Sequence, residues 1–220
     1  MSESSITVWG AVTPRALRVH WALEELGLEY NVQPIQSRTG ETQTEEYTQL
    51  NPKQKIPYLQ DGDFGISESA AIIEYLFRTY GAGKDVFVPA NTQEQAKSDE
   101  WSYFIMTELD AHTLYVMRRH GDLAEIYGDS PIAIASAEQY FMRLMRAVTP
   151  RIAAADPFLF GDKIGVADIL LATTLGWAHA YAVRLDEVAR EYMARTVDRP
   201  AYAAAMKRNA LPPRRPPPEE

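Results

Sequence analysis

Cysteine is absent from all 220 residues of the sequence. Its absence excludes disulfide bonds, thiolate metal sites and every mechanism in which a cysteine of the protein is the nucleophile. Long apolar runs are absent too, because no stretch approaches the ~18 consecutive apolar residues that a membrane-spanning helix needs. Residues Met1–Ile6 contain Ser and Glu rather than a basic stretch followed by an apolar run. We therefore expect no secretory signal, no membrane partner and a cytoplasmic location.

Positive charge is also in deficit. The chain has 22 Lys and Arg against 30 Asp and Glu, a net charge of −8, and a surface of that sign is unsuited to nucleic acid. The four His residues lack the spacing of metal ligands, so no metal site is predicted. Hydrophobic residues make up 46% and charged residues 24%, as in folded globular proteins.

Two kinds of pattern divide the chain. From Ile6 to Tyr80 short extended segments alternate with helical ones, whereas from Thr92 to Met206 only helical periodicity appears. Glycines and a proline separate the two parts. The predicted organisation is a first domain over residues 1–81, a linker over 82–91, an all-helical domain over 92–211 and a low-complexity, Pro-rich tail over 212–220.

The first part is predicted to be an α/β unit. Thr13 and Pro14 are typical of the N-cap and first turn of a helix, and an Asp61-Gly62 pair between apolar runs predicts a β-hairpin. The expected elements are a strand over Ile6–Trp9, a helix from Thr13 to about Gly27, a strand over Glu29–Pro34, a short helix within 36–50, the hairpin around 61–63, and a helix from about Ser67 to Tyr80.

The second part is predicted to be a bundle of five helices. The first is a long helix from about Thr92 to Arg119, whose buried face would contain Trp101, Phe104, Ile105, Leu109, His112 and Val116. The others begin near Ser130 or span Val166–Ala180, Leu185–Thr196 and Arg199–Met206.

The segment NPKQKIPYL at residues 51–59, followed by SESAAIIEYL at 67–76, resembles the glutathione transferase family. The resemblance extends over roughly Ile6 to Met206. It implies an α/β plus all-α fold, with a thioredoxin-like N-terminal domain and a helical-bundle C-terminal domain. It also implies glutathione as cosubstrate, a small electrophile as second substrate, a homodimer, and a cis peptide bond before Pro57.

The resemblance assigns roles to five residues around this segment. Ile56 and Pro57 would present main-chain groups to the extended tripeptide. Glu68 and Ser69, at the N-terminus of a helix, would bind the ammonium and carboxylate of its γ-glutamyl end. Lys55 would contact the glycyl carboxylate or the backbone.

Activation of the thiol is assigned to Thr13. The family uses Tyr, Ser or Cys, but the first strand has no Tyr and the chain no Cys. When Arg18-Val19 is aligned on the end of the serine-type motif SSxSxRV, Thr13 falls on the activating serine. Pro14 and Ala16 depart from that motif, and Arg15 stays open as another source of positive field near the sulfur.

Two further predictions concern the helical domain. Tyr103 and Met106 lie off the buried face of the long helix, and we expect them to line the electrophile pocket. Asp168 resembles the family's buried N-capping aspartate, although Gly165 replaces the usual hydroxyl residue, so its predicted role is structural.

The function implied by this resemblance is attack of a glutathione thiolate on a small electrophile. Two alternatives stay open. One is a specialised glutathione-dependent isomerase, dehalogenase, ether-cleaving enzyme or peroxidase. The other is a protein with little catalysis that acts by binding protein partners, for which the Pro-rich tail would be a binding segment.

Overall fold

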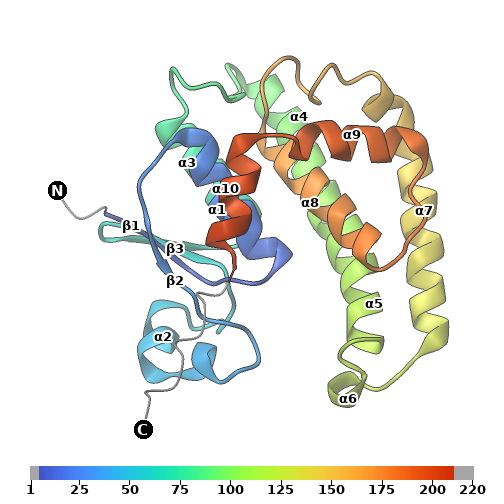
Figure 1. Cartoon of the computed structure of the whole chain (residues 1–220), viewed down its shortest axis with the longest axis horizontal. Helices are drawn as coiled ribbons and strands as arrows, with labels where there is room; N and C mark the ends of the chain where they lie inside the picture. The colour runs from blue at the N-terminus through green and yellow to red at the C-terminus, as the bar shows by residue number, and fades with distance from the viewer. Residues whose placement is uncertain (1–4, 211–220) are drawn as a thin grey trace, which may run out of the picture.

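The computed structural model describes residues 5–210, so the predicted Pro-rich tail lies outside the described residues. An N-terminal sheet with flanking helices and a C-terminal group of long helices lie side by side (Figure 1). The N-terminal elements are β1 (Ile6–Trp9), α1 (Pro14–Leu26), β2 (Asn31–Gln33), η1 (Glu41–Gln43), α2 (Glu45–Leu50), β3 (Tyr58–Asp61), β4 (Phe64–Ser67) and α3 (Ser69–Tyr80).

The sheet has the strand order β2-β1-β3-β4. Strands β1 and β2 are parallel, and α1 connects them, whereas β3 pairs antiparallel with both β1 and β4. The predicted hairpin is confirmed, with Gly62 at φ 58° in its turn. Helices α1 and α3 cover one face of the sheet, and α2 lies beyond the other (Figure 1). This is the thioredoxin-like arrangement that the resemblance implied.

Residues 81–91 form neither helix nor strand. The C-terminal helices follow them. They are α4 (Thr92–Tyr103), the π-helical segment η2 (Phe104–Leu114), α5 (Tyr115–His120), α6 (Ala124–Tyr127), α7 (Pro131–Ala153), α8 (Val166–Ala180), α9 (Glu187–Val197) and α10 (Pro200–Arg208).

The predicted long helix contains a π-helical segment that its sequence period did not indicate. Each π turn holds more residues than an α turn, so the buried face shifts around the axis. Trp101, Ile105 and Leu109 are buried as expected, but the side chain of His112 is 67% exposed and Leu114 is buried instead. This shift also places the carboxylate of Asp110 inside the protein.

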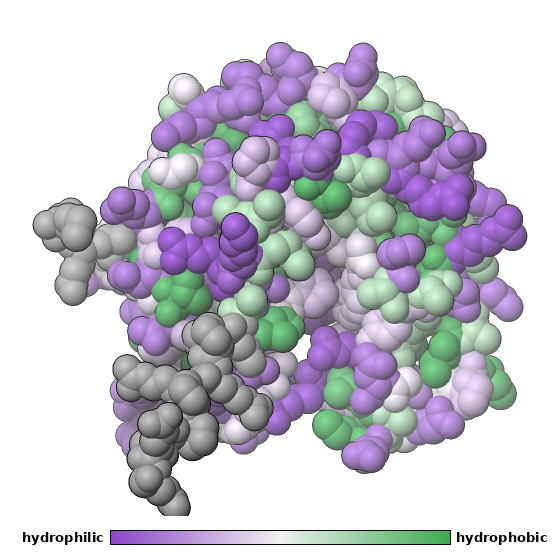
Figure 2. Space-filling view, in the orientation of Figure 1, coloured by the Kyte–Doolittle hydropathy of each residue, from purple (hydrophilic) through white to green (hydrophobic). Residues whose placement is uncertain are grey.

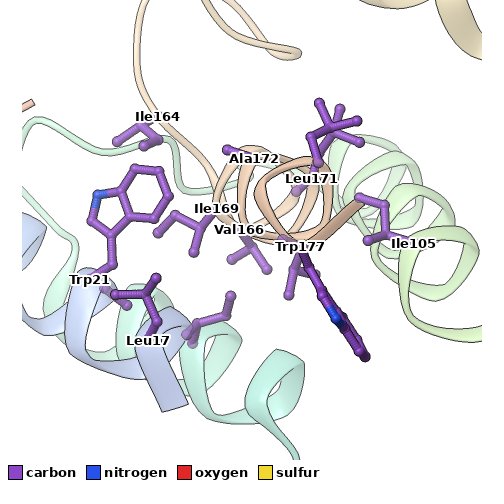
Figure 3. Packing of buried hydrophobic residues seen from close by; sticks show 14 of the residues in the cluster. Leu17, Trp21, Ile105, Ile164, Val166, Ile169, Leu171, Ala172 and Trp177 are labelled. Carbon is purple, nitrogen blue, oxygen red and sulfur yellow. The ribbon is translucent and has the colours of Figure 1, made fainter. Parts of the chain in front are cut away.

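The core of the C-terminal domain is centred on α8, most of whose residues are buried. In Figure 3, α8 passes between α1, which contributes Leu17 and Trp21, and η2, which contributes Ile105. Because α8 packs against elements of both domains, the two domains share one apolar cluster. That shared cluster fixes the position of the cleft between them.

The last predicted helix of the bundle packs elsewhere. Helix α10 lies against α1 of the N-terminal domain (Figure 1). The rings of Trp21 and Tyr202 meet edge to face at 4.8 Å, and the two Arg199 nitrogens that bind Glu25 are each 2.7 Å from one of its oxygens. Just after α10, the carbonyl of Asn209 accepts a hydrogen bond from Val12 at 2.8 Å and so holds the loop that precedes α1.

Candidate active site

A cavity of about 590 Å³ opens between the two domains. Figure 2 shows the hollow between the lobe that contains α2 and the end of the C-terminal helices near α6. The residues predicted from three separate segments of the sequence meet around it. Thr13, Arg15, Lys55, Ile56, Pro57, Glu68 and Ser69 all line this cavity.

Thr13 is both the N-cap of α1 and a lining residue. Its hydroxyl oxygen accepts a hydrogen bond from the backbone N–H of Ala16 at 3.0 Å. A hydroxyl that accepts in this way still has its own proton to donate. Thr13 also stands at the positive end of the α1 dipole, which favours an anion such as a thiolate. The geometry therefore allows capping and thiol activation together.

The peptide bond between Ile56 and Pro57 is cis, as the resemblance implied. The loop before it is fixed by α2 and its C-cap, because the carbonyl oxygen of Lys55 accepts hydrogen bonds from Tyr47 Oη at 2.6 Å and Asn51 Nδ2 at 2.7 Å. With its carbonyl thus occupied, Lys55 presents an exposed side chain at the edge of the cavity.

Glu68 and Ser69 begin α3 at the cavity. Glu68 is the N-cap residue with φ 74°, a left-handed conformation that is costly for a residue with a Cβ and is concentrated at functional sites. Its carboxylate pairs with Lys53 Nζ at 2.7 Å, with both side chains largely exposed. Ser69 is the first helical residue and is buried. The first-turn N–H groups of α3 lack intrahelical partners, which suits this end of the cavity to a carboxylate.

Behind this surface lies a buried charged cluster. Arg18 is inaccessible to solvent and donates to Asp110 Oδ2 and Thr174 Oγ1, each at 2.9 Å, while Arg15 binds the other oxygen of the same carboxylate. Arg18 Nη1 also lies 3.3 Å from Ser69 Oγ. Arg18 therefore connects the ion pair with Asp110, which joins η2 to α1, with Ser69, which lines the cavity.

The charged groups in this cluster shift the pKa values of one another. Burial alone would raise the pKa of the Asp110 carboxyl, but the charge of Arg18 and the hydrogen bond from Arg15 outweigh it and lower that pKa. Burial lowers the pKa of Arg18, with Asp110 opposing. The Asp110 carboxylate is therefore ionised and forms ion pairs with two guanidinium groups, those of Arg15 and Arg18.

The C-terminal side of the cavity differs from the sequence prediction. Neither predicted pocket residue is among the lining residues: the side chain of Tyr103 is exposed, and Met106 Sδ lies 3.1 Å from Arg18 Nη1 in the cluster behind the cavity. The lining comes from further along the chain. Tyr115 and Arg118 of α5, Tyr127 of α6 and Trp177 of α8 form this side.

Sequence reasoning missed these residues because α6 had not been predicted and because the π-helical segment changes the direction of every later side chain on the long helix. The Arg118-Arg119 pair was the signal available, although the sequence has two other adjacent basic pairs, Lys207-Arg208 and Arg214-Arg215. Arg15 lies with its guanidinium 5.0 Å from the ring centre of Tyr115 and 6.0 Å from that of Trp177, so it joins the two sides.

Asp168 lies away from the cavity, at the N-terminus of α8. Its carboxylate accepts hydrogen bonds from the N–H groups of Leu159 at 2.8 Å and Gly165 at 2.7 Å and from the hydroxyl of Tyr192. Because Gly165 has no side chain, only this half of a reciprocal cap is present.

Within residues 5–210, no group of three or more His, Asp and Glu side chains is arranged to hold a metal ion. Over the same range, every helix is too short or too polar to cross a lipid bilayer.

Comparison with known proteins identifies the family. The family model described as glutathione S-transferase, N-terminal domain, matches residues 4–78, and that described as glutathione S-transferase, C-terminal domain, matches residues 131–208. Glutathione S-transferase hmp2 of Hypomyces subiculosus is 30% identical over 170 residues, which cover 74% of this chain and 78% of that protein. The chain belongs to the glutathione S-transferase family.

Other relatives agree over shorter or more divergent stretches. Mouse glutathione S-transferase theta-3 is 30% identical over 151 residues, 68% of this chain and 62% of that protein. The matches span 44% to 62% of the lengths of the first curated relatives. The crystal structure of the theta class glutathione S-transferase from Xanthomonas axonopodis pv. citri with glutathione bound is 24% identical, covers 92% of this chain and 97% of that chain, and superposes with a TM-score of 0.76. That structure shares the fold.

Proposed function

We propose that this protein is a glutathione transferase that activates the thiol of glutathione for attack on a small electrophile. The observation that carries the proposal is the meeting of Thr13, the cis Ile56-Pro57 segment and Glu68-Ser69 around one cavity between the domains. Each supplies something that the tripeptide needs: a donor for sulfur, main-chain partners, and a site for the γ-glutamyl end.

The charges of the cavity support this ligand. Its lining includes five basic side chains and one acidic side chain, Glu68, in a chain whose net charge is −8. Bound as a thiolate, glutathione has two carboxylates, one ammonium and the sulfur anion. In our proposal the γ-glutamyl carboxylate lies at the α3 N-terminus beside Ser69, the ammonium meets Glu68, and the glycyl carboxylate meets Lys55.

The chemistry follows from the position of the sulfur. A free thiol has a pKa of about 8.5 and is mostly protonated at neutral pH. A hydrogen bond from Thr13 and the positive end of α1 would lower that pKa and increase the fraction of thiolate. Holding thiolate and electrophile in one cavity then lowers the barrier further by proximity. Glutathione-rich cytoplasm is the compartment where this reaction is proposed to occur.

Calorimetric titration with glutathione tests the proposal. We expect the parent protein to bind, and Ser69→Ala and Glu68→Gln each to weaken binding by about 1–3 kcal/mol, because each leaves a charged group of the ligand without its partner. Glu191→Gln is the control of matched charge, since Glu191 is exposed on α9 and lines neither this cavity nor the second one. No binding by the parent would refute the proposal.

We also propose a homodimer. Two features support a second copy as partner. Phe64 is 47% exposed on β4, at the edge of the sheet. A second cavity of about 560 Å³ is lined by four apolar and three charged residues: Trp101, Phe104, Val148, Phe160, Lys97, Glu100 and Arg151. Sedimentation of the full chain should give about twice the mass of one chain, and a monomer at all concentrations would contradict the proposal.

A further inference from the structure

The C-terminal side of the main cavity is basic and phenolic rather than purely apolar. It is formed by Tyr115, Arg118, Tyr127 and Trp177, and Arg38 reaches it from the loop after β2. Most of the groups that the proposed function assigns to glutathione lie on the opposite, N-terminal side, although the charge of Lys55 reaches Tyr127 and helps to lower its pKa. Arg118, the lining cation that belongs to the C-terminal domain, is therefore left for the second substrate.

Arg118 is the clearest case of a cation without a partner on this side of the cavity. Among the described residues its side chain forms no ion pair and no hydrogen bond, and its Nε is buried with no acceptor. Asp122, four residues further along the chain, accepts a hydrogen bond from the hydroxyl of Tyr181 instead. A buried guanidinium donor without an acceptor is costly, and a ligand that supplies the acceptor removes that cost.

Arg38 adds a second cation. Its Nη2 donates to the hydroxyl of Tyr115 at 3.2 Å, and its guanidinium lowers the pKa of Tyr127. Over residues 5–210, Arg38 pairs with no carboxylate. Arg15 differs from Arg38 in this respect, because its guanidinium forms an ion pair with Asp110. Two uncompensated guanidinium groups and two phenols thus share this side of the cavity.

We propose that the side of the cavity lined by Arg118 and Arg38 binds a carboxylate carried by the electrophile. This rests on the proposed function and names its substrate class: a small electrophile with a carboxylate remote from the reacting carbon. A guanidinium group offers parallel N–H donors that match a carboxylate. For an aryl halide of this class, the thiol loses its proton to solvent, sulfur bonds to the ring carbon, and halide departs with the electron pair of the broken carbon–halogen bond.

The test uses unreactive ligands, so that binding is measured without turnover. S-benzylglutathione and S-(4-carboxybenzyl)glutathione differ only in the remote carboxylate, and each is titrated by calorimetry. We expect the carboxylated ligand to bind about tenfold or more tightly than the plain one, the range of a charge-assisted hydrogen bond. In Arg118→Gln this preference should be largely lost, with Arg38 left to supply what remains, while the affinity for S-benzylglutathione stays, which also shows that the variant is folded.

Two further variants sharpen the comparison. Arg118→Lys keeps the charge but loses the fork of parallel donors, so it should keep part of the preference. Arg143→Gln makes the same change of net charge on the exposed surface of α7, away from the cavity, and should keep all of it. Loss of preference in Arg143→Gln would reduce the effect to net charge and overturn the proposal.

The remaining outcomes separate the two proposals. Equal binding of both ligands by the parent would overturn the carboxylate site while leaving the glutathione site intact. No binding of either ligand or of glutathione would overturn the proposed function, and the carboxylate site with it. A second tripeptide has the same carboxylate chemistry, so glutathione disulfide is the third ligand. If only the disulfide loses affinity in Arg118→Gln, the site belongs to a second tripeptide and the small-electrophile assignment is wrong.

Discussion

The guanidinium of Arg18 and the carboxylate of Asp110 form an ion pair, 2.9 Å from Nη2 to Oδ2, in which neither side chain is exposed to solvent. Arg18 belongs to α1 and Asp110 to η2, so the pair joins the two domains. Because Arg18 also lies 3.3 Å from Ser69 Oγ, the pair stands directly behind the proposed γ-glutamyl site. We therefore expect stability and binding at the proposed site to be coupled at this point.

Asp110→Asn should destabilise the protein strongly. The variant leaves Arg18 buried with no opposite charge, and breaking a buried pair by removing one partner typically costs about 3–5 kcal/mol. Urea denaturation measures the free energy of unfolding. Arg78→Gln breaks the surface pair with Glu74, which lines neither cavity, and should change that free energy by less than about 1 kcal/mol. Equal effects of the two variants would mean that the buried pair contributes no more than a surface one.

Asp168→Asn tests the predicted structural role of the cap. The amide can replace one oxygen but not both, so one of the three donors loses its acceptor inside the protein, at a cost of about 1–3 kcal/mol. We expect a lower urea midpoint with unchanged affinity for glutathione, because Asp168 lies away from the cavity. A variant of unchanged stability that has lost glutathione binding would assign this residue to the site instead.

Much of the N-terminal domain could be predicted from local signals. The strand Ile6–Trp9, the cap at Thr13 and the turn at Gly62 each depend on a few neighbouring residues, and each is found where the pattern predicted it. The lining of the cavity by Thr13, Pro57 and Ser69 was predictable only through family resemblance, since periodicity alone does not bring three distant segments together.

The C-terminal side of the cavity could not be predicted in this way. The partner of Asp110 is 92 residues away along the chain, and nothing around Asp110 in the sequence marks it as buried. The π-helical segment changes the phase of the helix, so a period of 3.6 wrongly predicted burial of His112, which lies within that segment. Helix α10 has an ordinary amphipathic pattern, which says that it packs but not that it packs on α1.

The pH dependence of stability should have a component from His20. Burial lowers the pKa of this residue from 6.5 to about 4, and its Nδ1 has no hydrogen-bond partner within the described residues. As the pH falls from 7 to 5, the unfolded chain takes up a proton at His20 that the folded protein does not. The free energy of unfolding therefore falls, by about 2 kcal/mol from this group over that range.

His20→Gln isolates this component. Glutamine can donate to the carbonyl of Gly10, which lies 3.2 Å from His20 Nε2, but it does not titrate. Burial raises the pKa of Asp168 to about 6, which acts in the opposite direction over the same range, but that group is present in both proteins and cancels in the comparison. Denaturation at pH 7 and pH 5 should show the smaller acid-side loss in the variant, and equal losses would show that His20 is protonated alike in both states.

Thr13 decides whether the sulfur is activated by a hydroxyl. Thr13→Val keeps the shape but removes both the donor and the cap, so the thiol pKa of bound glutathione should rise by about one to two units, the equivalent of a hydrogen bond worth roughly 1.5–3 kcal/mol. Activity should fall about ten- to hundredfold with little change in affinity, and loss of the cap to Ala16 should separately lower stability by about 0.5–2 kcal/mol. Thr13→Ser keeps the hydroxyl oxygen and its proton and should retain most activity, which distinguishes loss of the donor from loss of the threonine shape.

The measurement for Thr13 is the thiolate absorbance of bound glutathione as a function of pH. Identical titration curves for the parent and Thr13→Val would mean that Thr13 only caps α1. Because the charge of Arg15 is already paired with Asp110, the N-terminus of α1 would then be left as the source of activation.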